Sequence, residues 1–182
     1  LASALSKAAS LLGKLSGACL QLPNPDLLII PYLNKEALMS SRIEGTRISL
    51  SDLLISEIEG KESQYEDALE VTNYVSAVNY GLDKIKESKM TPDLIKEMHK
   101  ILMRNTRGRD KLPGQYRNIQ NWVGDQNSTL SNAQFVPPAP EQVSKLIEDL
   151  FNFLNMQDDI PPLVKCALIH YQFETIHPFC DG

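Results

Sequence analysis

The chain has 182 residues and a mass of 20.4 kDa, which fits one domain or one domain with a small appended subdomain. Its 18 basic and 23 acidic residues give a net charge of −5, which argues against a nucleic-acid partner. No apolar run approaches the roughly 20 residues of a membrane span, so no membrane partner is expected. Its three cysteines include no CxxC pair, which argues against a disulfide framework and favours a cytoplasmic location.

The first 45 residues are expected to contain two helices joined by a linker. Apolar residues between 1 and 20 are spread as in an amphipathic helix and are not gathered into a signal-peptide core. Prolines interrupt residues 20–32, which are therefore interpreted as the linker. Asn34 then caps a short helix that Gly45 ends.

Helical periodicity dominates the next part of the chain. A stripe with alternating spacings of three and four residues predicts one long helix: Ala68, Val71, Val75, Val78, Leu82 and Ile85. Thr91, Pro92 and Asp93 form an N-cap, a first-turn proline and an acidic first turn, which together predict a new helix. The side chains of this helix that are expected to point inward are Leu94, Met98, Ile101 and Leu102.

Two further helices are predicted near the end of the chain. The first covers residues 140–156, with an inward stripe of Val143, Ile147, Leu150, Phe151 and Leu154. The second covers residues 161–177, which are apolar on nearly every side. A helix of that kind is usually surrounded by other helices, so we expect it to be the central helix of the domain.

Residues 106–139 are not helical in pattern, because glycines and prolines interrupt them. They contain two short β-prone runs, residues 120–123 and 134–136, separated by a polar, turn-like stretch. The sequence therefore predicts an all-α fold that carries one small β-hairpin.

Three side chains near the end of the chain have metal-ligand spacing. His170, Glu174 and His177 lie at i, i+4 and i+7, on one face of the predicted central helix. One interpretation is a metal-dependent hydrolase that uses all three. The alternative is that His170 is a core histidine with its hydrogen bonds satisfied and Glu174 a paired carboxylate.

The last six residues combine groups that suit phosphate chemistry. Pro178 ends the helix at His177, whose imidazole can then point into a cleft. Phe179 can anchor the turn in the core, and Asp181 offers a hard oxygen ligand beside the flexible backbone of Gly182. The alternative is an ordinary His-Pro turn followed by a solvated aspartate.

These residues and several others resemble the Fic-domain family. Residues 177–182, HPFCDG, are similar to the first half of the motif H-x-F-x-[DE]-G-N-G-R-x-x-R, and residues 40–46, SSRIEGT, resemble the family's inhibitory motif [ST]-x-x-x-E-[GN]. Residues 114–117, 121–124 and 135–138 are similar to the stretch that flanks the family's flap hairpin. The order and spacing of these segments, from about Leu22 to Gly182, carry the resemblance.

The resemblance implies a Fic-type helical bundle that transfers AMP from ATP to a hydroxyl side chain of a target protein, its own included. His177 would be the general base, for which a neutral imidazole is suited near neutral pH. Asp181 would hold Mg²⁺, Gly182 would open the phosphate-binding loop, and Phe179 would be structural.

The same resemblance implies an inhibitory helix at about residues 34–45, as in class II members of the family. Ser40, Glu44 and Gly45 occupy its defining positions, and the glutamate would pair with the second arginine of the long motif. ATP would then bind in a pose that does not react. Without the resemblance, the segment is a plain helix end with a glycine cap and a solvated glutamate.

Four hairpin residues would hold the target segment by strand addition, which needs backbone hydrogen bonds and little target sequence. They are Trp122, Val123, Phe135 and Val136. The alternative is that these side chains only pack the hairpin on the core.

The expected organisation is an N-terminal helical region over residues 1–60 and a Fic core over residues 61–182. The second half of the long motif, with both arginines, is not in this sequence, so the resemblance implies that the core continues beyond Gly182. A chain that ends there would leave Glu44 without a partner. The alternative function is then a helical interaction module that kept the fold and lost the reaction.

Overall fold

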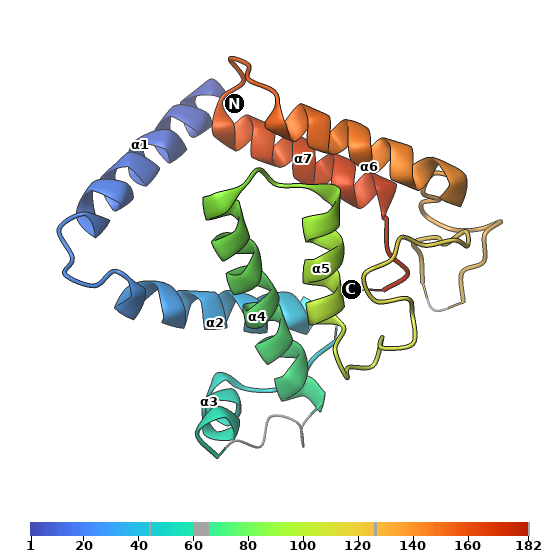
Figure 1. Ribbon diagram of the computed structural model, residues 1–182, viewed down its shortest axis with the longest axis horizontal. Coiled ribbons are helices and arrows are strands. Elements are labelled where there is room, and N and C mark those ends of the chain that lie inside the picture. Colours follow the sequence, from blue (N-terminus) through green and yellow to red (C-terminus); the bar gives the residue numbers. More distant parts are fainter. Residues whose placement is uncertain (44, 60–65, 126, 182) are drawn as a thin grey trace.

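The computed structural model describes residues 1–43, 45–59, 66–125 and 127–181, which form seven α-helices (Figure 1). In chain order the helices are α1 (Ala2–Cys19), α2 (Asp26–Ile43), α3 (Leu50–Glu59), α4 (Glu66–Glu87), α5 (Pro92–Leu102), α6 (Pro140–Asn155) and α7 (Pro162–Ile176). The predicted all-α fold is confirmed. None of the described helices is long and apolar enough to cross a membrane.

An antiparallel pair, α4 and α5, forms the centre of the arrangement (Figure 1). Helix α2 packs across α4, and α6 and α7 lie side by side at the other edge, with α6 against α5. Helix α4 approaches α5 closely at Gly81, where an added Cβ would lie 2.7 Å from the sulfur of Met98 and that side chain would have to shift.

Two apolar clusters stabilise this arrangement. The buried members of the first come from α2, α3 and α4: Ala37, Leu38, Leu53, Ala68 and Val71. The buried members of the second come from α6 and the end of α7: Val143, Ile147, Leu150, Phe151 and Ile176. The second cluster therefore fixes the helix end from which the C-terminal motif leaves.

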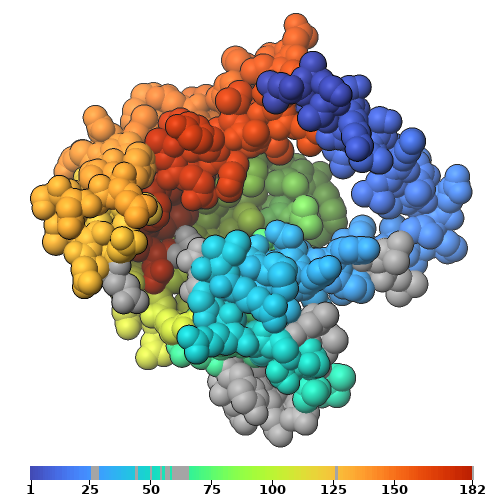
Figure 2. Space-filling model, turned by 180° about the vertical axis from the view of Figure 1, so that it is seen from behind, coloured from blue at the N-terminus to red at the C-terminus, as the bar shows by residue number. Residues whose placement is uncertain are grey.

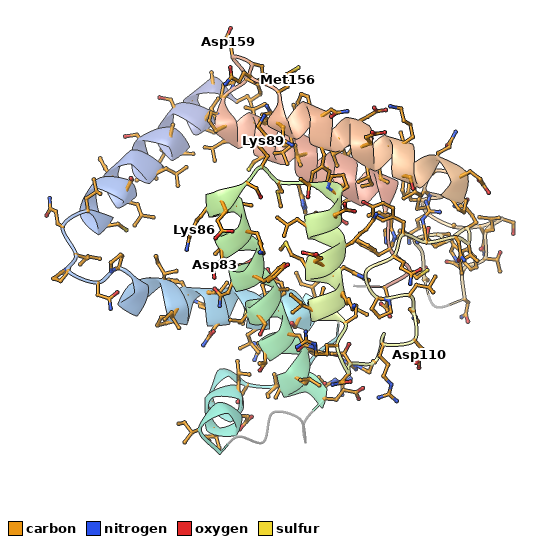
Figure 3. All side chains as sticks on the ribbon, in the orientation of Figure 1. Asp83, Lys86, Lys89, Asp110, Met156 and Asp159 are labelled. Atoms are coloured by element: carbon orange, nitrogen blue, oxygen red, sulfur yellow. The ribbon has the colours of Figure 1, made fainter. Side chains whose placement is uncertain are left out.

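Most of the predicted helices are present. Thr91 caps α5 as expected, since its side chain accepts a hydrogen bond from the Leu94 N–H. In α4 the helix is confirmed but the buried face is only partly as predicted, because Leu82 and Ile85 are exposed near the C-terminal end of the helix, where Figure 3 labels Asp83 and Lys86.

The prediction of a linker over residues 20–32 is wrong for its second half. Helix α2 begins at Asp26 and continues through Pro31, so Asn34 lies inside a helix and does not cap one. A proline removes one backbone hydrogen bond and disfavours a helix. Packing of Ala37 and Leu38 against α4 supports the helix in spite of this cost.

The prediction that α7 is a central helix is also wrong for the described residues. Ile176 is its buried residue, whereas Leu168 and Tyr171 are exposed, Tyr171 by 69%. Figure 2 shows α7, in red, on the surface of the molecule. Helix α7 packs on α6 with one face, and no described helix covers the face that carries Tyr171.

The predicted hairpin is reduced to one antiparallel bridge between Val123 and Phe135. The Val123 N–H donates to the Phe135 carbonyl at 2.9 Å, and the Phe135 N–H donates back to the Val123 carbonyl at 3.1 Å. Among the described residues no strand extends from this bridge. The carbonyls of Asn121 and Pro137 beside it accept hydrogen bonds from the Gln120 side chain.

The two clusters predict where truncation destabilises the protein. Leu38→Ala should lower the free energy of unfolding by about 2–5 kcal/mol, because it leaves a cavity between α2 and α4. Met39→Ala, one position along the same helix and largely exposed, should cost under about 1 kcal/mol. Urea unfolding followed by circular dichroism measures both values, and equal losses would contradict the assigned core.

Candidate active site

The C-terminal motif begins where α7 ends. The helix stops at Ile176, as the following proline predicts, and the His177 N–H donates to the Phe173 carbonyl at 2.9 Å. His177 itself has left-handed backbone angles, φ 46° and ψ 66°. A residue other than glycine keeps this conformation only where surrounding contacts hold it.

A buried arginine provides those contacts. Arg117 is 2% exposed, and its Nε donates to the His177 carbonyl at 2.8 Å. A second guanidinium nitrogen donates to the carbonyls of Pro138 at 2.5 Å and Ile176 at 3.3 Å. The backbone N–H of Arg117 also donates to the Pro178 carbonyl at 2.9 Å. Burial lowers the pKa of the guanidinium, and carbonyls at a helix C-terminus favour its positive charge.

The His177 side chain is held by an amide. Asn121 Nδ2 lies 2.9 Å from His177 Nδ1 and 3.3 Å from the Phe179 carbonyl oxygen. Asn121 lies two residues before Val123 of the bridge, so the loop of the predicted flap also positions the predicted base. The imidazole is half-buried.

The next turn is anchored by an aromatic stack. Phe179 is buried, and its ring is parallel to the His99 ring, with centroids 3.8 Å apart. His99 Nδ1 accepts from the Gly114 N–H at 2.8 Å, so Nε2 carries the proton that is donated to the Asp181 carbonyl at 2.7 Å. Gly114 has φ +76°, and a Cβ there would lie 2.9 Å from the Lys96 carbonyl.

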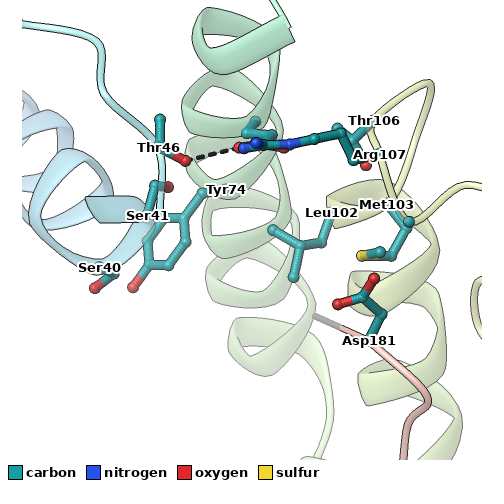
Figure 4. Close-up of a pocket in the computed structure, with 11 residues that line it drawn as sticks. Ser40, Ser41, Thr46, Tyr74, Leu102, Met103, Thr106, Arg107 and Asp181 are labelled. Atoms are coloured by element: carbon teal, nitrogen blue, oxygen red, sulfur yellow. Dashed lines mark hydrogen bonds and ion pairs between the residues drawn. The ribbon is translucent and has the colours of Figure 1, made fainter. Parts of the chain in front are cut away.

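Asp181 lies at one side of a pocket of about 400 Å³ (Figure 4). Its carboxylate is half-exposed and pairs with Lys111 Nζ at 3.0 Å. Gly108 approaches this carboxylate so closely that a Cβ there would lie 2.9 Å from Oδ2. The carboxylate thus already faces a cation and has access to solvent.

The same pocket is lined by residues of the N-terminal region. Ser40 and Ser41, from the last turn of α2, lie across from Asp181, and Tyr74 of α4 lies next to them (Figure 4). Leu102 and Met103 line the pocket on the side of Asp181. The two segments of the sequence that resemble Fic motifs therefore contribute to one pocket, although about 140 residues separate them.

A charged cluster joins these two sides of the pocket. Arg107 binds Glu70 with two hydrogen bonds of 2.8 and 2.7 Å, and Thr46 Oγ1 donates to the same carboxylate at 2.7 Å. Burial would raise the pKa of Glu70, but the hydrogen bonds from Arg107 and Thr46 outweigh it and lower that pKa. Thr46 directly follows the predicted inhibitory motif, so this cluster fixes the end of that segment.

Of the predicted inhibitory residues, Ser40 lines the pocket and Gly45 ends α2 with φ +100°. Glu44 lies outside the described residues, as does Gly182 of the phosphate-binding loop. The four predicted flap side chains, Trp122, Val123, Phe135 and Val136, are each about two-fifths exposed. They surround the bridge and are accessible to another chain.

The alternative metal site is not assembled. His170 and Glu174 lie on the exposed face of α7, with 4.0 Å between His170 Nδ1 and Glu174 Oε1. His177 leaves the helix and bonds to Asn121. Within residues 1–43, 45–59, 66–125 and 127–181, no group of three histidine, cysteine, aspartate or glutamate side chains could hold a metal ion.

Four site residues were not predicted by sequence reasoning: Arg117, Asn121, His99 and Lys111. Arg117 and Asn121 lie in segments that resemble the family, but nothing in their pattern gave them a role. His99 has the spacing of an ordinary helix residue. For the first three of these residues, the partners in the C-terminal motif are 56 to 82 positions away, so no local signal could reveal those contacts.

The chain has a helical fold, and residues of both motif segments line one pocket. Comparison with known sequences identifies the family of proteins to which it belongs. The model of the Fic/DOC family matches residues 89–182, and that of the Fic/DOC family N-terminal region matches residues 2–83. The chain belongs to the Fic/DOC family.

Two relatives found by sequence comparison carry the name protein adenylyltransferase, one of them as a probable member. The chain is 28% identical over 148 residues to the protein adenylyltransferase fic-1 of Caenorhabditis elegans, covering 77% of this chain and 27% of that protein. It is 28% identical over 160 residues to a probable protein adenylyltransferase of Aquifex aeolicus, covering 84% of this chain and 45% of that protein. The chain thus spans less than half the length of these relatives.

Solved structures share the fold. A Fic family protein from Desulfovibrio desulfuricans superimposes with a TM-score of 0.68 at 25% identity, covering 98% of this chain and 53% of that chain. A Fic domain containing signaling protein from Bacteroides thetaiotaomicron gives a TM-score of 0.70 at 22% identity, covering 91% of this chain and 63% of that chain.

The buried arginine predicts a large loss of stability on substitution. Arg117→Met should lower the free energy of unfolding by about 3 kcal/mol, because it leaves several buried carbonyls without a donor. Arg109→Met, an exposed position in the preceding loop, is the matched control and should change little. Urea denaturation measures both, and a loss below about 1 kcal/mol for Arg117→Met would contradict this role.

His99 predicts a pH dependence of stability. Burial lowers the pKa of His99, so below its ordinary value of about 6.5 the unfolded chain binds a proton that the folded state resists. The stability that depends on neutral His99 is present above that pH and is lost as the pH falls. The urea midpoint should therefore drop between about pH 7.5 and about pH 5.5, and by less in His99→Gln. An equal drop in both proteins would refute this assignment.

Proposed function

We propose that this chain carries the active-site region of a protein adenylyltransferase, which transfers AMP from ATP to a hydroxyl side chain of a target protein, its own included. The observation that carries the proposal is the pocket that Asp181 of the C-terminal motif shares with Ser40 of the N-terminal motif. Membership of the Fic/DOC family and the adenylyltransferases at 28% identity support it.

In this proposal His177 is the general base. Its backbone is fixed by Arg117 and its ring by Asn121, so the imidazole does not have to be ordered when the target binds. A group that is already in place loses little entropy in the transition state, and general base catalysis contributes a factor of about 10²–10⁴ to the rate.

Asp181 is the proposed Mg²⁺ ligand. A half-exposed carboxylate at the side of the pocket, already paired with the Lys111 ammonium, suits a hard cation. Mg²⁺ held there by Asp181 would offset the charge that develops on the leaving pyrophosphate. His99 holds the Asp181 backbone and Phe179 anchors the turn, so both serve that carboxylate without touching the nucleotide. Gly182 would contribute a backbone N–H to the phosphates.

The end of α2 is the proposed brake on this reaction. Ser40 is at the pocket, and Thr46 is tied to Glu70 and through it to Arg107. Glu44 lies between Ser40 and Thr46 in the sequence, and in this proposal it makes the inhibitory contact. We propose the N-terminal region, residues 1–60, as the regulatory part and residues 61–182 as the catalytic part.

The exposed side chains around the Val123–Phe135 bridge are the proposed contact for the target. In this proposal an extended segment of the target pairs with the backbone beside this bridge, as in strand addition. Trp122 and Val136 flank the bridge and would frame the hydroxyl-bearing residue near His177.

Two substitutions in the full-length protein test the proposal. Glu44→Gly should raise the transfer of AMP from α-labelled Mg-ATP to protein by about tenfold, since it removes an inhibitory contact. His177→Ala in the same background should lower the transfer by about 10²-fold or more.

Lys35→Gly is the matched control for Glu44→Gly, because it introduces a glycine at an exposed position of α2 outside the motif. It should leave the rate near that of the unaltered protein. Unchanged transfer in Glu44→Gly would refute the brake, and undiminished transfer in His177→Ala would refute the assigned base.

A further inference from the structure

The contact between Asn121 and His177 constrains the protonation of the proposed base. Asn121 Nδ2 lies 3.3 Å from the Phe179 carbonyl oxygen, which can only accept a hydrogen bond. This carbonyl therefore orients the amide with its nitrogen inward. The same nitrogen lies 2.9 Å from His177 Nδ1.

An amide nitrogen can only donate, so Nδ1 of His177 must be the acceptor. In the neutral ring the proton then sits on Nε2. Neither ring nitrogen then has a free lone pair, because the lone pair of Nδ1 accepts the hydrogen bond from the amide and Nε2 carries the proton. In this arrangement the imidazole cannot accept a proton from a substrate.

Two further observations indicate how the base becomes available. Among the described residues, Nε2 of His177 has no hydrogen-bond partner, so it is the nitrogen open to a target hydroxyl. The Oδ1 atom of Asn121 is buried and also has no partner within the described part of the chain. A buried acceptor without a donor costs free energy, and turning the amide over would bring Oδ1 to Nδ1.

We propose that Asn121 is a positioning residue that selects the tautomer of His177 and thereby controls the base. With its nitrogen inward, the amide holds the Nε2–H tautomer, which is inactive. With its oxygen inward, the amide accepts from Nδ1–H and leaves a lone pair on Nε2. This inference rests on the proposed function of His177.

The proton balance of the reaction fits the second orientation. The target O–H bond breaks, its proton moves to Nε2, and the oxygen forms a bond to the α-phosphorus of ATP. The bond from that phosphorus to the bridging oxygen breaks, and pyrophosphate leaves with the electron pair. The imidazolium that forms donates Nδ1–H to Asn121 Oδ1, which stabilises its charge.

Two substitutions of Asn121 separate the two tautomers. Asn121→Asp keeps the shape of the side chain but offers only acceptors, so it should fix the Nδ1–H tautomer. Asn121→Leu has a similar size and no polar group, so it should leave a mixture. Both variants are made in the full-length protein, and circular dichroism confirms their helical content.

The first readout is the ¹⁵N spectrum of the histidine ring nitrogens, with the His177 signals assigned by their loss in His177→Ala. The unaltered protein should show a protonated Nε2 and an unprotonated Nδ1 at His177, and Asn121→Asp should show the reverse. A protonated Nδ1 in the unaltered protein, or an unchanged pattern in Asn121→Asp, would overturn the inference.

The second readout is AMP transfer. The kcat of Asn121→Asp should exceed that of the unaltered protein by about tenfold, and the kcat of Asn121→Leu should lie between the two. A group that favours the wrong tautomer can lower kcat by far more than this factor. The KM for Mg-ATP should stay within about twofold, since Asn121 does not line the nucleotide pocket.

The two readouts distinguish failure of this inference from failure of the proposed function. If the tautomers respond as expected but no variant, including Glu44→Gly, transfers AMP, then the proposed function fails and the tautomer selection stands. If AMP is transferred and Asn121→Asp is no faster than Asn121→Leu, the control of the base by Asn121 is overturned.

Discussion

The buried guanidinium of Arg117 is the contact on which the site depends. It donates to the carbonyls that end α7 and to the loop carbonyl of Pro138, so one side chain joins a helix end to two loops. Helix C-termini leave carbonyls without intrahelical partners, and a buried end must find donors elsewhere. Because Arg117 supplies them, His177 can keep a left-handed backbone and direct the chain back toward α5.

From that turn onward, each residue of the motif is held by a group from a different part of the chain. Asn121 holds the His177 ring, and His99 on α5 holds both the Phe179 ring and the Asp181 backbone. Such side chains lose little freedom when a substrate binds, which is the physical basis of preorganisation. The helices themselves supply few of the functional groups and mainly fix the loops that do.

A chain of contacts along the pocket connects the N-terminal region to the C-terminal motif. Glu70 on α4 binds Thr46 on one side and Arg107 on the other, and the loop of Arg107 reaches Asp181 through Gly108. A displacement of the end of α2 would therefore shift residues on both sides of the pocket. Charged hydrogen bonds with two donors on one carboxylate have defined geometry, which suits them to this coupling.

The sequence by itself determined the helical class, the helices over residues 92–102 and 140–155, and the two motif segments. These depend on local spacing, on capping by Thr91 and on residues adjacent in the chain. Only the tertiary structure decided that α2 runs through Pro31, that α7 has an exposed face, and that Ser40 and Asp181 share a pocket. It alone also identified Arg117, Asn121 and His99 as partners of the motif. The reason is physical: a hydrogen bond between residues more than 50 positions apart depends on how whole helices pack, and no periodicity along the chain encodes it.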